Sequence, residues 1–427
     1  MSAVSVKPSR PPTVQLHDRA AAEAYIASIC FKHGPPRLIG VELEWIVQHA
    51  DDPRRPLEAQ RLADALGVHA PPTIRPGSPN APLPAGSTVT IEPGGQVEIS
   101  TPPRESLGDL LATAHRDAAA ITDLITAAGL RLAHTGTDPY RPPHRLVQSA
   151  RYNAMHESYR RDGSSGAYMM CSTAAVQPCL DAGANGQLGL RWAALYALGP
   201  VLVAAFANSP MLNGRSTGWA CTRMAVWADL RCATSPPSGN GTDPAAAYAR
   251  HALDAPLLCV RRTDREWLVP RGLSFGDWLD GAAGLPWPPT TDDLDYHLTT
   301  VFPPVRPRGH LEVRYLDAQP AGRWPLPVAV LAALLADDAS TAAALELAAP
   351  AAGRWLDAAR HGLADPILAE TATAVFEQAC ARLPALGPPD WLQRELELVT
   401  ERRVRRGLGV AHAADADATD AGSWPGR

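Results

Sequence analysis

Five glutamates lie in short segments of the chain where charged and apolar residues alternate. The segments are 40–47, 88–92, 96–100 and 310–316, and the glutamates are Glu42, Glu44, Glu92, Glu98 and Glu312. Because successive side chains of a strand point to opposite faces, each segment predicts a strand with its carboxylates on one face and its apolar residues on the other. Pro93-Gly94-Gly95, between the two middle segments, predicts an antiparallel hairpin.

These carboxylates could bind a divalent cation. For any single strand the alternative is an ordinary solvated sheet face. Across four segments that alternative weakens, because glutamate is depleted in strands and like charges on neighbouring strands destabilise a sheet. Hard carboxylate oxygens suit Mg²⁺, which favours nucleotide phosphates as further ligands. The pattern therefore predicts a magnesium and nucleotide site on the charged face.

Arginine supplies nearly all of the positive charge. Of the 39 basic residues only Lys7 and Lys32 are lysines. From residue 33 onward a lysine-containing phosphate loop and a Schiff-base mechanism are therefore excluded. An anion bound there must be held by arginine, by backbone N–H groups or through a metal. Arginines in segments 151–160, 208–223 and 302–306 could clamp a carboxylate or a phosphoryl group, although each one alone could equally form a surface ion pair.

The composition excludes several other classes of protein. The net charge of −5 gives no electrostatic footprint for nucleic acid or an acidic membrane. Seven cysteines without a CxxC pair indicate neither a disulfide framework nor a structural zinc site. Without a signal-peptide pattern or a continuous run of 18 apolar residues, we expect a cytoplasmic protein.

The elements together predict an α+β fold, in which helices pack on the apolar face of an antiparallel sheet and the charged face stays open. Segment 168–177 is expected to be a further strand. We expect a single domain over residues 15–410, with loose termini at 1–14 and 411–427. Helices are predicted at 18–30, 57–66, 105–128, 151–160, 187–206, 325–347, 352–382 and 388–406.

Six segments occur in the order that is found in one enzyme family. They are GVELEW, IEPGGQVEIS, RYNAM, MMCSTAAVQ, FANSP…NG…R and FPPVRPRGHLEVRYLD, and they lie within residues 35–330. In these segments the chain resembles the glutamate–cysteine ligases of the plant-type branch, and most closely the actinobacterial ligase of ergothioneine biosynthesis.

The resemblance implies a fold and a reaction. The fold would be similar to that of glutamine synthetase and the guanidino kinases, with a curved antiparallel sheet whose open face binds Mg²⁺ and ATP. ATP would phosphorylate the γ-carboxylate of glutamate, and the amine of cysteine would attack the γ-glutamyl phosphate. The products would be γ-glutamylcysteine, ADP and phosphate.

The resemblance also implies roles for individual residues. Arg223, Arg314 and Glu312 would be catalytic. The metal ligands would be Glu42, Glu44, Glu92, Glu98 and Glu312, and the residues that bind substrate or cofactor would be Glu98, Gln177, Arg151, Tyr152, Asn208 and Arg306. The chain departs from the family at Pro178-Cys179, where the family usually carries an apolar residue and asparagine.

Two alternatives stay open at this stage. A ligase of the same fold could use another amine acceptor, because the acceptor pocket cannot be read from the sequence. A non-catalytic binding relative could have kept the fold, although it would not need to retain five mutually repelling carboxylates. The expected partners are glutamate, cysteine and ATP, with neither nucleic acid nor membrane, and the oligomeric state is not predicted.

Overall fold

The computed structural model describes residues 13–184, 186–230, 243–263, 266–281, 285 and 287–411. The termini that were expected to be loose lie almost entirely outside these ranges.

An open antiparallel sheet forms the centre of the fold. Its order is β2 (Thr88–Ile91), β3 (Val97–Ser100), β1 (Ile39–His49), β5 (Ala175–Leu180), β9 (Leu311–Val313) and β8 (Val305–Pro307). β4 (Leu130–Ala133) pairs with β1, and β10 (Leu316–Asp317) pairs with β5. A separate small hairpin joins β6 (Met211–Leu212) and β7 (Arg215–Ser216). The predicted α+β class, the β2–β3 hairpin and the strands in segments 40–47 and 96–100 are confirmed. Glu92 lies just after the end of β2, and the predicted strand at 310–316 is interrupted at residues 314 and 315, between β9 and β10.

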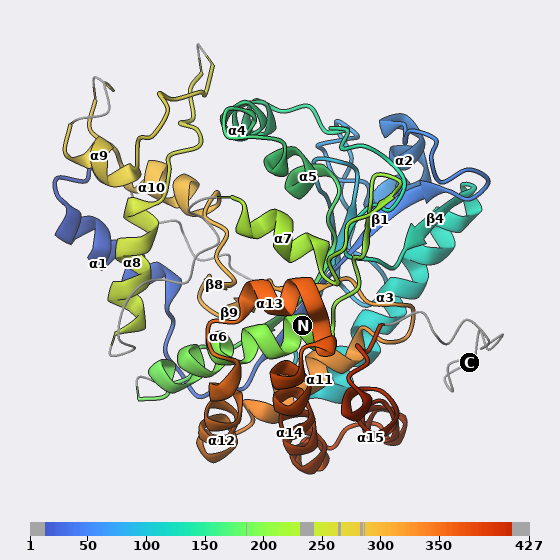
Figure 1. Ribbon diagram of the computed structural model, residues 1–427. Coiled ribbons are helices and arrows are strands. Elements are labelled where there is room, and N and C mark those ends of the chain that lie inside the picture. Colours follow the sequence, from blue (N-terminus) through green and yellow to red (C-terminus); the bar gives the residue numbers. More distant parts are fainter. Residues whose placement is uncertain are drawn as a thin grey trace, which may run out of the picture.

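Helices cover the apolar face of this sheet, as predicted. Val41 and Leu43 of β1 and Ile99 of β3 are at most 1% exposed and belong to the main core. The covering helices are α3 (Leu107–Ala127) and α11 (Pro325–Leu334). Further helices pack around these: α6 (Leu188–Ala205), α12 (Asp338–Ala348), α13 (Trp355–His361), α14 (Pro366–Arg382) and α15 (Asp390–Arg402). Of these, α12, α14 and α15 lie at the bottom of Figure 1.

Helix α6 is the one described helix that is long and apolar enough to cross a bilayer. Its position argues for a core helix, because 72% of it is buried inside the fold, where it packs against α12 and α13. Five other helices lie elsewhere in the described chain, namely α1 (Arg19–Cys30), α2 (Ala59–Leu66), α8 (Pro244–Asp254), α9 (Phe275–Leu279) and α10 (Thr291–Leu298).

Strand register brings the charged residues into neighbouring rows. Glu44 of β1 lies opposite Glu98 of β3, and Glu42 lies opposite Gln177 of β5. On the far side of β5, Cys179 lies opposite Glu312 of β9. Three helices approach this face, namely α4 (Ala150–Arg160), α5 (Ser165–Cys171) and α7 (Thr222–Ala228). These helices therefore cover part of the charged face, which the sequence predicted to be open.

The strand that was predicted at 168–177 is wrong over its first half. Residues 165–171 form α5, and the strand begins only at Ala175. A short apolar run such as Tyr168-Met-Met-Cys171 does not distinguish a buried helix from a buried strand by its periodicity.

Two long predicted helices are each divided in the structure. The 325–347 segment bends by 109° between α11 and α12, and Asp337 caps the new helix by accepting a hydrogen bond from the Ser340 N–H. The 352–382 segment is broken at Gly362, whose φ of 56° is in the left-handed region. Pro366 then starts α14 at a position where its missing N–H costs nothing.

Close packing of the β2–β3 turn on α5 gives a test of the fold. A methyl group on Gly94 would lie 2.2 Å from the backbone oxygen of Cys171, and no rotamer change can relieve a backbone clash. We expect Gly94→Ala to lower Tm by several degrees in differential scanning fluorimetry. Gly108→Ala is the control, because a Cβ there meets nothing within 4 Å. An unchanged Tm for Gly94→Ala would contradict this packing.

Candidate active site

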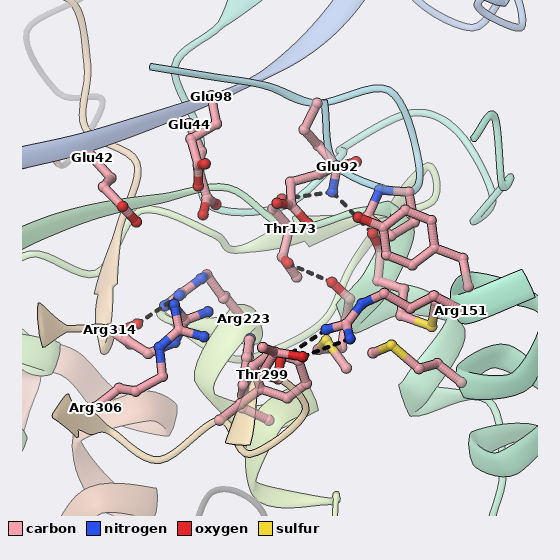
Figure 2. Close-up of a pocket in the computed structure, with 18 of the residues that line it drawn as sticks. Glu42, Glu44, Glu92, Glu98, Arg151, Thr173, Arg223, Thr299, Arg306 and Arg314 are labelled. Atoms are coloured by element: carbon pink, nitrogen blue, oxygen red, sulfur yellow. Dashed lines mark hydrogen bonds between the residues drawn. The ribbon is translucent and has the colours of Figure 1, made fainter. Parts of the chain in front are cut away.

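A cavity of about 240 Å³ lies between the charged face of the sheet and helices α4, α5 and α7. Four of the predicted glutamates and four of the predicted arginines line it. They are Glu42, Glu44, Glu92, Glu98, Arg151, Arg223, Arg306 and Arg314. In Figure 2 the glutamates point from the sheet toward the arginines on the opposite side of the cavity.

The glutamates of the sheet hold protons more tightly than ordinary carboxyl groups do. Burial raises the pKa of Glu42 to about 8, and the charges of Glu98 and Glu312 add to that shift. The pKa of Glu98 rises to about 7, because of burial and then the charge of Glu92. The pKa values of Glu44 and Glu92 are also raised, in both cases first by burial. These carboxyls therefore keep their protons to higher pH than free glutamates do, unless a cation neutralises them.

Glu312 differs from the other four because two arginines neutralise it. The Arg306 Nη2 donates to its Oε1 at 2.8 Å and the Arg306 Nε to its Oε2 at 3.1 Å, while Arg314 donates to Oε1. Burial raises the pKa of Glu312, but the charges of Arg306 and Arg314 outweigh it and lower the pKa to about 2. Its predicted role as a metal ligand stays a prediction, and as a ligand it would share its charge between these arginines and the ion.

Gln177 orients Glu44. Its Nε2 donates to the Glu44 Oε1 at 2.5 Å, and its side chain is only 1% exposed. The Gln177 Oε1 is buried and has no hydrogen-bond partner among the described residues. This amide lies where the resemblance implied a metal or substrate ligand, and its oxygen is available to accept a hydrogen bond.

Arg223 is 2% exposed yet incompletely paired. Its Nη2 donates to the backbone oxygen of Arg314 at 2.6 Å, and the guanidinium lies 5.7 Å from the ring centre of Trp227. Its Nε has no hydrogen-bond partner among the described residues. Because a buried guanidinium is costly to leave partly unpaired, this arrangement suits the capture of an anion in the cavity.

The opposite end of the cavity is mainly apolar. Arg151 closes it by donating to the Thr299 Oγ1 at 2.7 Å and to the Thr299 backbone oxygen at 2.8 Å, which joins α4 to the turn after α10. Pro93, Tyr152, Met155, Met169 and Met170 line this end. Trp227 and Phe302 also line the cavity, but they lie against the Arg314 guanidinium, 5.7 Å from each ring centre. Tyr152 was predicted, whereas the three methionines, Trp227 and Phe302 were not, since apolar residues carry no chemical signal in a sequence.

Asn208 is not among the described residues that line this cavity. Its Nδ2 donates to the backbone oxygens of His134 and Ala318, at 2.8 and 2.7 Å. The structure therefore gives Asn208 bonds that hold a loop in place, and its predicted contact with substrate stays a prediction.

A second cavity of about 430 Å³ adjoins the first, and Glu42 and Arg308 line both. Lys32 and His310 lie in its wall, together with the β1 and β5 residues Gly40 and Cys179. The sequence analysis gave Lys32 no role, because it lies outside every recognised motif. Arg308 stood within one of the quoted motifs, FPPVRPRGHLEVRYLD, but nothing in its spacing singled it out.

Within the described part of the chain, no three His, Cys, Asp or Glu side chains already stand in an arrangement that could hold a metal ion. Four of the five candidate ligands line the first cavity, whereas Glu312 is bonded to Arg306 and Arg314 and is not among the lining residues.

Comparison with known proteins identifies the family of the chain. The model of glutamate–cysteine ligase family 2 matches residues 38–411. The glutamate–cysteine ligase EgtA of Mycobacterium tuberculosis is 39% identical over 381 residues, which cover 88% of this chain and 86% of that protein. The chloroplastic glutamate–cysteine ligase of Arabidopsis thaliana is 29% identical over 356 residues, covering 81% and 67%.

A solved glutamate–cysteine ligase from Francisella tularensis, in complex with AMP, aligns with 88% of this chain and 82% of that one. The TM-score of 0.45 and the identity of 13% are too low to transfer any feature of its site. The match of the family model over most of the chain and the identity to EgtA are sufficient by themselves: the chain belongs to glutamate–cysteine ligase family 2.

Proposed function

We propose that this protein is an ATP-dependent glutamate–cysteine ligase that joins the amine of L-cysteine to the γ-carboxylate of L-glutamate. The observation that carries the proposal is a cavity in which four sheet glutamates face arginines, in a chain of this family. The products are γ-glutamylcysteine, ADP and phosphate. Its similarity to EgtA supports a place in ergothioneine biosynthesis in the cytoplasm.

The two adjoining cavities suggest how the substrates are divided. The second cavity is the larger, and Lys32, Arg308 and His310 supply it with polar and cationic groups that suit a nucleotide and its phosphates. The first cavity holds the anion-binding arginines and the apolar end, which suit the two amino acids. Glu42 and Arg308 line both, so the phosphoryl group would be transferred beside them.

The glutamates of the first cavity fit a magnesium ion by their chemistry. Their mutual repulsion and raised pKa values mean that a cation would replace bound protons and relieve the repulsion. Glu42, Glu44, Glu92, Glu98 and Glu312 would hold it. The chemistry that bound Mg²⁺ supplies is neutralisation of the charge on the phosphate oxygens of ATP.

The protein's own residues then have mainly a positioning role. Arg223 and Arg314 would bind the γ-carboxylate of glutamate and the phosphoryl group that it accepts, since phosphoryl transfer needs alignment and charge neutralisation. Gln177 keeps Glu44 oriented through its 2.5 Å hydrogen bond. The amine of cysteine attacks the γ-carbonyl carbon of the glutamyl phosphate and the C–O bond to phosphate breaks. The proton that the amine loses is taken up by the released phosphate, which leaves as hydrogen phosphate.

The apolar end supports cysteine as the acceptor. The CH₂–SH group of cysteine lacks a full charge and a strong hydrogen-bonding group, whereas the side chain of glutamate ends in a charged carboxylate. Methionine sulfurs and the ring of Tyr152 line this end of the cavity, where a thiol packs well and a hydroxyl would lose hydrogen bonds with water. A different small amine of similar polarity remains the second candidate acceptor.

A coupled assay of ADP release tests the proposed function. We expect release to require glutamate and an acceptor together, and to be fastest with cysteine. Serine and alanine serve as matched acceptors, because serine exchanges the thiol for a hydroxyl and alanine removes it. Release that is no faster with cysteine than with the other amines would overturn the assignment of the acceptor, and no release with any acceptor would overturn the ligase activity.

Substitution of Glu42 tests the carboxylate site. Because the pKa of Glu42 is raised to about 8, its side chain is mostly neutral at pH 7. A neutral glutamine at this position should therefore not lower the free energy of unfolding. We expect Glu42→Gln to lower kcat by at least about 100-fold with Tm unchanged or higher. Glu312→Gln should lower both kcat and Tm, because it removes the negative charge that neutralises the buried guanidinium of Arg306. Exposed Glu105→Gln is the control, and full activity of Glu42→Gln would contradict the site.

The raised pKa values predict how stability varies with pH. A carboxyl whose pKa is raised on folding contributes stability that is complete below its unfolded value, near 4.5, and is lost as the pH rises through the folded value. For Glu98 and Glu42 that loss begins near pH 4.5 and is complete near pH 7 and pH 8, respectively. In the metal-free protein we therefore expect Tm to fall between pH 6 and pH 9, and Mg²⁺ to raise Tm more at pH 9 than at pH 6.

Fluorimetric melting curves across this range, with and without Mg²⁺, provide the measurement. The Glu42→Gln variant is the internal control, since its Tm should depend less on pH. A metal-free Tm that stays constant or rises from pH 6 to pH 9 would show that these carboxyls do not titrate as the structure indicates.

A further inference from the structure

Asp317 is a buried carboxylate that lies outside both cavities. It belongs to β10, is 1% exposed, and accepts three hydrogen bonds from one loop. Its Oδ2 accepts from the Asn208 N–H at 2.8 Å and from the Ser209 hydroxyl at 2.7 Å, and its Oδ1 accepts from the Cys221 thiol at 3.2 Å. Asp317 therefore holds together both ends of the loop that leads into α7.

Ser209 connects Asp317 to the cavity. Its Oγ accepts a hydrogen bond from the backbone N–H of Arg223 at 3.1 Å, and its backbone oxygen accepts from the Thr222 N–H at 3.1 Å. A hydroxyl has a single proton. Because that proton goes to Asp317, the lone pairs of Ser209 are directed toward Arg223, and the carboxylate thereby fixes the first turn of α7.

Arg223 depends on this turn for its position. Its guanidinium has few bonds of its own, one to the backbone oxygen of Arg314 and a long contact of 3.9 Å to the Met224 sulfur. Burial lowers the pKa of Arg223, and the charge of Asp317 is the strongest influence that opposes this shift. The same helix carries Trp227 into the cavity.

The surroundings leave Asp317 no freedom to move. A methyl group on Gly136 would lie 2.4 Å from the carboxyl carbon of Asp317, so the backbone at 136 packs directly against the carboxylate. That backbone is itself fixed, since the Gly136 N–H donates to the Asn208 oxygen at 2.9 Å and its oxygen accepts from the Ala174 N–H at 3.0 Å.

We propose that Asp317 is a positioning residue for the ligase reaction, acting through the Ser209 hydroxyl and the first turn of α7 to place Arg223 in the cavity. This inference rests on the proposed function, because it assigns Arg223 a part in the reaction. An asparagine at 317 keeps the size of the side chain but replaces one acceptor oxygen by a donor, which misdirects Ser209 or Cys221.

A double-mutant cycle tests the proposal. We expect Asp317→Asn to lower kcat by about 100-fold, as a misplacement of about 1 Å can, while KM for ATP changes by less than about twofold because the nucleotide cavity is elsewhere. In the Arg223→Lys variant the side chain at position 223 is already misaligned. There Asp317→Asn should lower kcat by no more than about threefold, since the effects of two substitutions are not additive when one residue acts through the other. Ser209→Ala, which removes the hydroxyl that joins Asp317 to the Arg223 N–H, should lower kcat about 10-fold.

Asp117→Asn is the matched control. Asp117 is fully buried and, like Asp317, its carboxylate accepts backbone N–H bonds, from Ala85 at 2.7 Å and Ser87 at 2.9 Å. It lies in α3, on the apolar side of the sheet, so its substitution should lower Tm and leave kcat and KM unchanged. This control separates a loss of stability from a loss of alignment.

The outcomes distinguish the inference from the function on which it rests. A wild-type protein without cysteine-dependent ADP release would overturn both. With an active wild type, the inference alone fails if Asp317→Asn retains kcat within about twofold, or if it costs as much in the Arg223→Lys background as in the wild type. Should Asp317→Asn fail to fold, full activity of Ser209→Ala would overturn the proposal.

Discussion

Repulsion between glutamates on one face of a sheet is the constraint on which the rest of this structure depends. Glu44 and Glu98 are direct partners on β1 and β3, and Glu42 lies two residues away on the same face. In an ordinary sheet such pairs are destabilising. Here desolvation adds to the repulsion, so these carboxyls hold protons at pH values where free glutamates are ionised. The sheet is tolerated because its apolar face is fully covered by α3 and α11, which stabilise the strands independently of the charged face.

Glu312 is the one member of the five glutamates whose charge is neutralised by arginines at hydrogen-bond distance, among the described contacts. Arg306 and Arg314 flank it on β8 and after β9, and it stays ionised. The carboxylates on β1 and on the β2–β3 hairpin receive no arginine at hydrogen-bond distance among the described contacts, which leaves their neutralisation to protons or to a cation. This difference distinguishes Glu312, which is held in an ion pair with arginine, from the four cavity glutamates, for which we propose that a metal ion replaces the bound protons.

The sequence predicted the polar half of this site and little of its apolar half. Alternation placed all five glutamates on one face, because the period of a strand is visible in any residue type. It could not pair Glu44 with Glu98, since register depends on contacts between distant segments. Met155, Met169 and Met170 line the cavity, yet an apolar residue there cannot be told from one in the core by sequence. The apolar run at 168–171 was interpreted as strand for the same reason, since both buried helices and buried strands are apolar.

The positions of the arginine and lysine side chains in the two cavities show more than their numbers in the sequence do. An almost lysine-free chain must hold anions with arginine, and arginines do line the first cavity. Lys32, the single lysine among the described residues, lies instead in the wall of the adjoining cavity with Arg308. Arginine offers flat, bidentate contacts that align a carboxylate and a phosphoryl group, whereas lysine is a mobile point charge that tolerates phosphates in several positions. These properties suit the proposed division of the substrates. Arginines in the first cavity would align the reacting groups, and Lys32 and Arg308 in the second cavity would need only to bind the nucleotide.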